Sequence, residues 1–185
     1  MKFLNRFKTE ANTASNVFLC LLTGIFVFFL IVIQTTWIHA IEIFHVVPCL
    51  TFVFCVCYSI KKGGLLPIII SLACGFVLDA LNAGYVGVDA LLYMYISLGC
   101  VWLNECLFNK SLKVIMLCVL AASLLYTAAS FGVYFFIWGE TRIGFAFTHK
   151  MLPETVYNLV ITPVLYPFAC RCAGEKVRER GIYRE

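Results

Sequence analysis

Long apolar runs separated by short polar segments extend over most of the chain. Six runs can be marked, and each is long enough, or nearly so, to cross about 30 Å of hydrocarbon at about 1.5 Å per residue. Their expected bounds are 16–36, 40–60, 65–81, 88–108, 112–138 and 153–170. The pattern predicts an all-α integral membrane protein, with six transmembrane helices in one bundle and one domain over residues 1–185.

The composition supports this interpretation and limits the possible functions. Of the 185 residues, 62% are hydrophobic and only 13% are charged, far from the roughly half and quarter of soluble domains. Six spans leave no room for a soluble catalytic domain. The protein is therefore expected to act in or at the bilayer.

The basic residues sort to one side of the predicted bundle. Arg142 and Lys150 lie on one side, and the other twelve of the fourteen Lys and Arg residues lie on the opposite side. The positive-inside rule then places both termini in the cytoplasm, including a basic tail over residues 171–185. The net charge of +4 is explained by this topology, so we expect no nucleic acid partner.

Ten cysteines could indicate a disulfide framework or a metal site, but nearly all lie within apolar runs and no C-x-x-C occurs. Small buried residues are the favoured interpretation. The chain also has no nucleotide-binding G-x-x-x-x-G-K-[ST] motif and no G-x-S-x-G nucleophile motif. We therefore expect no cofactor, no metal and no enzymatic activity.

The segment "GFVLDALNAGYVG" places an aspartate, Asp79, near the end of an apolar run. An ionisable residue in a transmembrane helix is costly, and it is by default a candidate functional residue. Asp79 lies fourteen residues after Leu65, about 21 Å along the helix, which predicts a position in the outer third of the membrane. The following Asn82-Ala83-Gly84 can end a helix, and Asp89 after Gly87 suits the start of the next one. A tight helical hairpin is the expected structure.

Two roles for Asp79 are open at this point. The carboxylate could be a polar group near the interface, hydrogen-bonded to backbone or to another helix. Alternatively, it could be a contact residue or a proton-linked site inside the bundle.

The last apolar run carries a polar ridge. Glu154, Asn158, Thr162 and Tyr166 recur every four residues, which places them on one side of a helix. Pro163 and Pro167 fall in the same run and predict helix kinks. The ridge could pack inside this bundle, or it could dock a helix of another protein.

The block "GFVLDALNAGYVGVDALLYMYISLG" resembles the most recognisable stretch of the rod shape-determining protein MreD family. The elements of the resemblance are a G-x-x-x-D motif, a glycine-containing turn, and an apolar helix that opens with Ala-Leu. Further elements follow in the expected order: Pro48, the Lys61-Lys62-Gly63-Gly64 turn, "LFNKSL" and "LPETVYNLVITPVLYP". The positions of the first block are Gly75, Asp79, Gly84, Gly87, Ala90 and Leu91.

The resemblance implies a non-enzymatic membrane scaffold of the cell-wall elongation machinery of rod-shaped bacteria. It implies a multi-pass protein of the bacterial cytoplasmic membrane that binds MreC. RodA and a penicillin-binding transpeptidase would belong to the same complex, and MreB would be an indirect partner. It also implies a fold similar to the substrate-binding subunits of energy-coupling-factor vitamin transporters.

That similarity provides the alternative function, a substrate-binding subunit of such a transporter. Those subunits usually carry an A-x-x-x-A contact motif in the first span, which this chain lacks there. An intramembrane enzyme would need a catalytic pair at one depth, but no nucleophile or metal set accompanies Asp79 and Glu154. The favoured hypothesis is that Asp79, Gly75, Gly84 and Gly87 fix a hairpin that a partner recognises, and that the ridge belongs to the same or a neighbouring surface.

Overall fold

The computed structural model describes residues 2–36, 48–81, 87–106, 111–138 and 152–174. Within these residues the secondary structure is helical, as the apolar runs predict. The helices are α1 Lys2–Thr36, α2 Leu50–Lys62, α3 Leu65–Leu81, α4 Val88–Cys106, α5 Leu112–Trp138 and α7 Leu152–Cys172.

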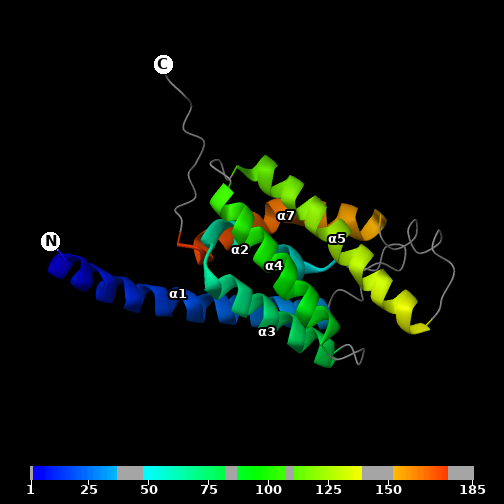
Figure 1. Cartoon of the computed structure of the whole chain (residues 1–185), viewed down its shortest axis with the longest axis horizontal. Helices are drawn as coiled ribbons and strands as arrows, with labels where there is room; N and C mark the ends of the chain where they lie inside the picture. Colours follow the sequence, from blue (N-terminus) through cyan, green and yellow to red (C-terminus); the bar gives the residue numbers. More distant parts are fainter. Residues whose placement is uncertain (1, 37–47, 82–86, 107–110, 139–151, 175–185) are drawn as a thin grey trace, which may run out of the picture.

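The bounds agree with the sequence pattern at α3 and α5 and differ most at α1 and α2. Helix α1 begins fourteen residues earlier than the expected 16–36, and its N-terminal part projects beyond the other helices (Figure 1). Helix α2 was expected over 40–60 but begins only at Leu50. Residues 40–47 lie outside the described part of the chain.

The late start of α2 has a local cause. Cys49 has a non-helical backbone (φ −86°, ψ 81°), and its N–H donates to the side chain of Asn158 rather than to a helical carbonyl. Pro48, which has no N–H, accepts a bond from Leu50 N in a tight turn (3.2 Å). At 13 residues, α2 is about 20 Å long, which is shorter than the hydrocarbon core of a bilayer.

Helix α2 forms the centre of the bundle, and the other five helices surround it (Figure 1). It contacts each of them. The surrounding helices also contact one another in a closed order of α1, α3, α4, α5, α7 and again α1. Consequently every residue of α2 from Thr51 to Lys61 is buried.

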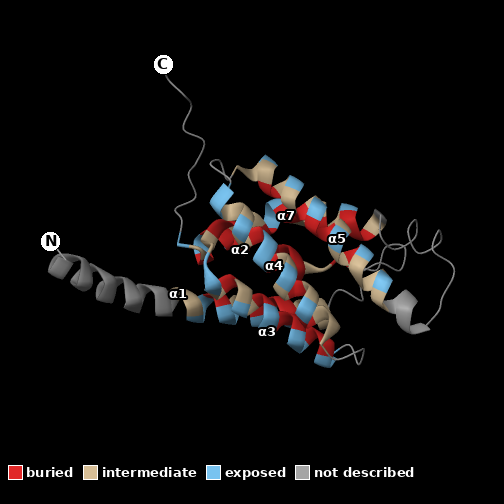
Figure 2. Cartoon of the chain, viewed as in Figure 1, coloured by how far each residue is buried: buried red, intermediate tan, exposed pale blue. Residues whose placement is uncertain are grey.

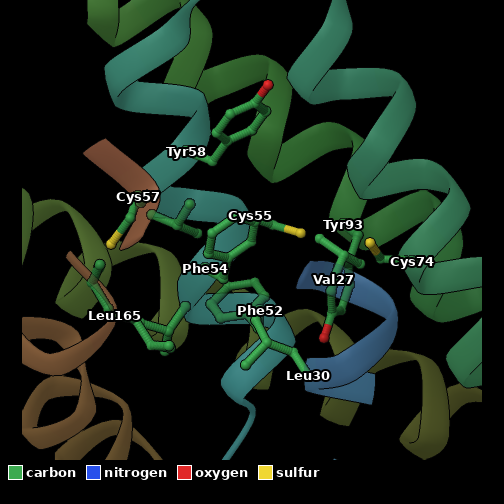
Figure 3. Packing of buried hydrophobic residues seen from close by; sticks show 14 of the residues in the cluster. Val27, Leu30, Phe52, Phe54, Cys55, Cys57, Tyr58, Cys74, Tyr93 and Leu165 are labelled. Carbon is green, nitrogen blue, oxygen red and sulfur yellow. The ribbon is translucent and has the colours of Figure 1, made fainter. Parts of the chain in front are cut away.

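Aromatic side chains and thiols fill the space around α2. Phe52 packs against Tyr93 and Tyr126, with ring centroids 5.4 and 4.8 Å apart. Figure 3 shows the sulfurs of Cys55 and Cys74 pointing toward each other among these apolar groups. All ten cysteines lie in the described residues and none of them is in a disulfide; Cys106 is exposed, and the others are buried or half-buried. The buried ones act here as small apolar core residues, as their positions in the sequence predict.

The outer faces of the surrounding helices are exposed (Figure 2) and carry large apolar side chains, whereas the interior holds polar side chains beside its apolar core. The outward apolar side chains include Phe28, Phe76, Trp102 and Leu125, each more than half exposed. An apolar exterior of this extent suits lipid, while polar groups gain hydrogen bonds in the interior. The buried polar side chains are Thr23, Thr51, Ser59, Lys61, Ser71, Asp79, Ser97, Ser123, Thr127, Glu154, Thr155, Asn158 and Thr162.

Two segments of the described residues are long and apolar enough to cross a membrane by length and composition, Leu19–Thr36 in α1 and Leu112–Val133 in α5. Helix α3 is apolar but one turn shorter than a typical span.

Candidate functional site

The carboxylate of Asp79 lies in the last turn of α3 and points at the beginning of α4. One oxygen, Oδ2, accepts hydrogen bonds from the backbone N–H groups of Gly87 (2.9 Å) and Ala90 (3.0 Å). The other oxygen, Oδ1, accepts one from the N–H of Asp89 (3.2 Å). The side chain is only 3% exposed. Asp79 therefore caps the helix that follows its own.

This placement also explains how a buried negative charge is tolerated. The first N–H groups of a helix have no partner within the helix, and together they carry a partial positive charge. Asp79 supplies acceptors to Asp89 and Ala90 of α4 and to Gly87 directly before it, whereas the C-terminal end of its own helix would disfavour an anion. Three charge-assisted bonds to backbone replace the hydration that the carboxylate loses.

Gly75 allows the two helices to come this close. A Cβ atom at position 75 would lie 2.5 Å from Ala90 Cα and 2.8 Å from Ala90 N, so no other residue fits without separating the backbones. Gly87 has φ of 106°, a conformation that side chains disfavour, and its N–H is one of the three bound by Asp79. Glycine is thus needed at positions 75 and 87 for different reasons: Gly75 allows the close approach of two helices, and Gly87 adopts a positive φ angle. Gly84 lies outside the described residues.

A second bond extends the hairpin to α5. The hydroxyl of Tyr126 donates to Oδ1 of Asp89 over 3.0 Å. The Tyr126 ring also meets Tyr93 of α4 edge to face, with centroids 5.7 Å apart. Helices α3, α4 and α5 are therefore held at one end of the bundle by two aspartates that have different partners.

The polar ridge of α7 faces the interior. Glu154, Asn158 and Thr162 are buried, and Tyr166 is half-buried. The opposite, exposed face of α7 carries apolar side chains, with Val156, Val160, Val164 and Phe168 at its centre. This placement favours packing within the bundle over the docking of another protein's helix on the ridge.

The ridge contacts α2 at both ends. Asn158 Oδ1 accepts from the N–H of Cys49 (3.1 Å), and the Cys49 thiol donates to Glu154 Oε1 (3.8 Å). At the other end, Lys61 Nζ lies 5.2 Å from the centre of the Tyr166 ring, a cation–π contact. The Thr162 hydroxyl donates to the carbonyl of Asn158 (2.7 Å) within its own helix.

Helix α7 is continuous through Pro163 and Pro167. The kinks expected at these residues stay a prediction.

Several residues of these contacts were not identified from the sequence. Gln34 of α1 accepts from both the N–H (3.0 Å) and the hydroxyl (2.8 Å) of Thr51, and Ser59 pairs with Ser97 (2.7 Å). Asn104 donates to the carbonyl of Ile60 at the C-terminal end of α2. One feature of the sequence could have identified two of them. Gln34 and Asn104 carry carboxamides near the ends of apolar runs, where an amide without a hydrogen-bond partner would be costly.

The contacts described at these sites are hydrogen bonds and packing contacts. Among the residues that the structure describes, no three His, Cys, Asp or Glu side chains lie together in a way that could hold a metal ion. The carboxylate of Asp79 is engaged with backbone donors, which stabilises a shape. What the hairpin offers to its surroundings is the exposed apolar face of α3 and α4, formed by Leu65, Ile69, Leu72, Phe76, Val77, Leu81, Leu91, Tyr95, Leu98 and Trp102.

Comparison with known families gives one finding. The family described as rod shape-determining protein MreD matches residues 15–171, which is most of the chain. The curated proteins gave no match, and the solved structures gave none either. The expected similarity to vitamin-transporter subunits thus has no support from a solved structure.

Proposed function

This chain belongs to the rod shape-determining protein MreD family, membrane proteins of rod-shape determination, and we propose that it acts there as a non-enzymatic scaffold. Its proposed partners are MreC, bound directly, and RodA and a penicillin-binding transpeptidase in the same complex. MreB would be an indirect partner. The proposed place of action is the bacterial cytoplasmic membrane.

We further propose that all six helices belong to one membrane-embedded bundle with both termini in the cytoplasm. The distribution of Lys and Arg supports this orientation, with twelve of fourteen on the side of the termini. The apolar exterior and the buried polar side chains support a lipid environment for the whole bundle. Helix α2 needs no contact with lipid along its length, because the other helices enclose it.

The observation that carries the scaffold proposal is the bonding of Asp79 to three N–H groups at the start of α4, including that of Gly87 directly before it. Combined with the backbone contact at Gly75, it fixes the angle and register of two helices whose outer faces are apolar and exposed. A rigid face is useful for recognition, because little ordering of side chains and backbone is required when a partner binds. We assign the α3–α4 face to the partner rather than the α7 ridge, since the ridge is buried.

The proposal is tested by purification of a tagged copy in mild detergent, with detection of MreC. The Asp79→Leu variant removes all three acceptor contacts and adds no charge to the membrane interior. We expect it to insert at the normal level and to recover several-fold less MreC. Normal recovery of MreC with this variant would contradict the proposal.

Surface variants separate a loss of recognition from a loss of shape. Phe76→Ala and Leu91→Ala alter exposed side chains of α3 and α4, and Leu117→Ala and Leu125→Ala make equivalent changes on α5. We expect only the first pair to reduce MreC recovery. If ABC-type ATPases and a bound small molecule were recovered in place of MreC, the chain would instead act as a transporter subunit.

A further inference from the structure

The beginning of α2 is a partly buried polar junction with α1 and α7. Its backbone donors are bound by side chains from two directions: Cys49 N–H by Asn158 Oδ1 of α7, and Thr51 N–H by Gln34 Oε1 of α1. The Gln34 amide also donates to the sulfur of Cys49 (4.0 Å). We call this set of residues, together with Tyr93 and Glu154, the α2 junction.

Two hydrogen-bond donors at the α2 junction lack a partner among the described residues. These are the amide nitrogen Nδ2 of Asn158 and the hydroxyl of Tyr93. Both side chains are buried, with exposed fractions of 0% and 2%. Buried polar atoms of this kind are rare, because each costs about 1–3 kcal/mol when it has no partner.

The orientation of the Asn158 amide is fixed by its neighbour. Its oxygen must face the N–H of Cys49, because a flipped amide would set two donors against each other. The nitrogen therefore points away from Cys49 and toward a position that needs an acceptor. The unpartnered donor is a consequence of the bond on the other side of the same group.

The Tyr93 ring lies against the first turn of α2, which begins directly after Cys49. The ring packs edge to face on Phe52, in the first turn of α2, and Figure 3 shows it among Val27, Leu30 and Phe52. The Tyr126 ring also packs against Phe52, with centroids 4.8 Å apart. In contrast to Tyr93, Tyr126 has an acceptor for its hydroxyl, the carboxylate of Asp89.

The chemistry of the α2 junction selects the kind of molecule that would bind. It must accept hydrogen bonds from an amide and a phenol, which excludes a cation. The nearby carboxylate of Glu154, bonded to the Cys49 thiol, disfavours an anion. A neutral molecule that both accepts and donates satisfies these conditions, and water is the smallest one.

We propose that the α2 junction binds internal water, which accepts from Asn158 Nδ2 and Tyr93 Oη and donates to carboxylate or carboxamide oxygens around it. Buried water typically makes about three hydrogen bonds to groups that would otherwise be unsatisfied. Such water would provide hydrogen-bond partners for the two unpartnered donors where α1, α2, α4 and α7 approach one another.

The direction in which one substitution shifts the midpoint of thermal unfolding tests this proposal. Tyr93→Phe removes the hydroxyl and keeps the ring packing. If water binds the hydroxyl, the midpoint of thermal unfolding in detergent falls, as it should in the matched control Tyr126→Phe, which loses the bond to Asp89. If the hydroxyl is unpartnered, its removal leaves the midpoint unchanged or raises it, and the proposal is overturned.

A direct measurement uses solid-state NMR in bilayers with selective transfer of magnetisation from water. The side-chain amide signal of Asn158, assigned by its loss in Asn158→Leu, should receive magnetisation at short mixing times. No transfer to that signal would contradict the proposal. Native mass spectrometry that finds a retained organic molecule, absent from Asn158→Leu, would overturn the water assignment in favour of that molecule.

Discussion

In both the α3–α4 hairpin and the α2–α7 contact, a side chain accepts hydrogen bonds from backbone N–H groups at the start of a helix. The two regions differ in the kind of side chain and in its distance along the chain. In the hairpin, a charged side chain binds three N–H groups that lie eight to eleven residues further along the chain. Between α2 and α7, a neutral amide binds one N–H that lies 109 residues away. The hairpin is thus a local structure that keeps one face exposed, while the α2–α7 contact is long-range and enclosed.

The difference shows what each contact can tolerate. The hairpin depends on backbone proximity, since there is no room at Gly75 for even one more carbon. The α2–α7 contact depends on a row of side chains, each of which makes a modest contribution. A single change should therefore affect the hairpin more than the α2–α7 contact.

The largest effect is expected for Gly75→Val, because its side chain would collide with the backbone of Ala90. We expect a loss of about 3 kcal/mol or more of unfolding free energy, or failure to accumulate. A thiol-reactive fluorogenic dye can follow unfolding, because Cys55, Cys57 and Cys74 are buried until the bundle opens.

The control for this experiment is Gly99→Ala on α4, where an added Cβ meets no atom within 4 Å. It should be neutral or slightly stabilising, since alanine is the better helix former. Equal losses for the two variants would show that the close approach at Gly75 does not hold the hairpin together.

The next effect is expected for Asp79→Asn, which keeps one acceptor oxygen and replaces the other with a donor group. At least one N–H of α4 then loses its acceptor, and the charge-assisted character of the remaining bonds is lost. We expect a loss of about 2 kcal/mol in unfolding free energy by the same dye method. The exposed Glu105→Gln on α4 is the control and should change little; a similar loss there would indicate a general charge effect.

A smaller effect is expected for Asn158→Leu, which removes the acceptor of the Cys49 N–H. The cost is that of one unsatisfied backbone donor, about 1–2 kcal/mol, reduced by the apolar contacts that leucine gains. Val160→Ala on the exposed face of the same helix serves as the control. If Asn158→Leu destabilised the protein more than Asp79→Asn, the ranking of the two regions would be wrong.

The smallest effect is expected for Ser97→Ala, which removes the bond to Ser59 between α2 and α4. Hydrogen bonds between helices in membranes contribute about 0.6 kcal/mol on average, and Ser59 retains its bond to the carbonyl of Cys55. A double-mutant cycle of Ser59→Ala and Ser97→Ala measures the coupling directly. A coupling above about 1.7 kcal/mol would exceed the range found for such pairs.

The sequence predicts well what depends on neighbouring residues. The helix bounds of α3 and α5, the hairpin after Asp79 and the inward character of the cysteines follow from periodicity, glycine positions and apolar context. The start of α2 could not be predicted, because the backbone of Cys49 is non-helical in a contact with Asn158, a residue of the last helix. The pairing of Gln34 with Thr51 depends in the same way on how the helices are arranged around α2.

The central position of α2 also has a consequence for synthesis of the protein. Helices are made in chain order, so α3 and α4 can form their hairpin as soon as residue 90 has been inserted, whereas α2 is made earlier and lacks its α7 partner until the end of translation. The Cys49 N–H then has no Asn158 to bind, and α2 is too short to be a comfortable lipid-exposed span on its own. A nascent chain stopped before α7 should therefore have a formed hairpin and an incomplete centre.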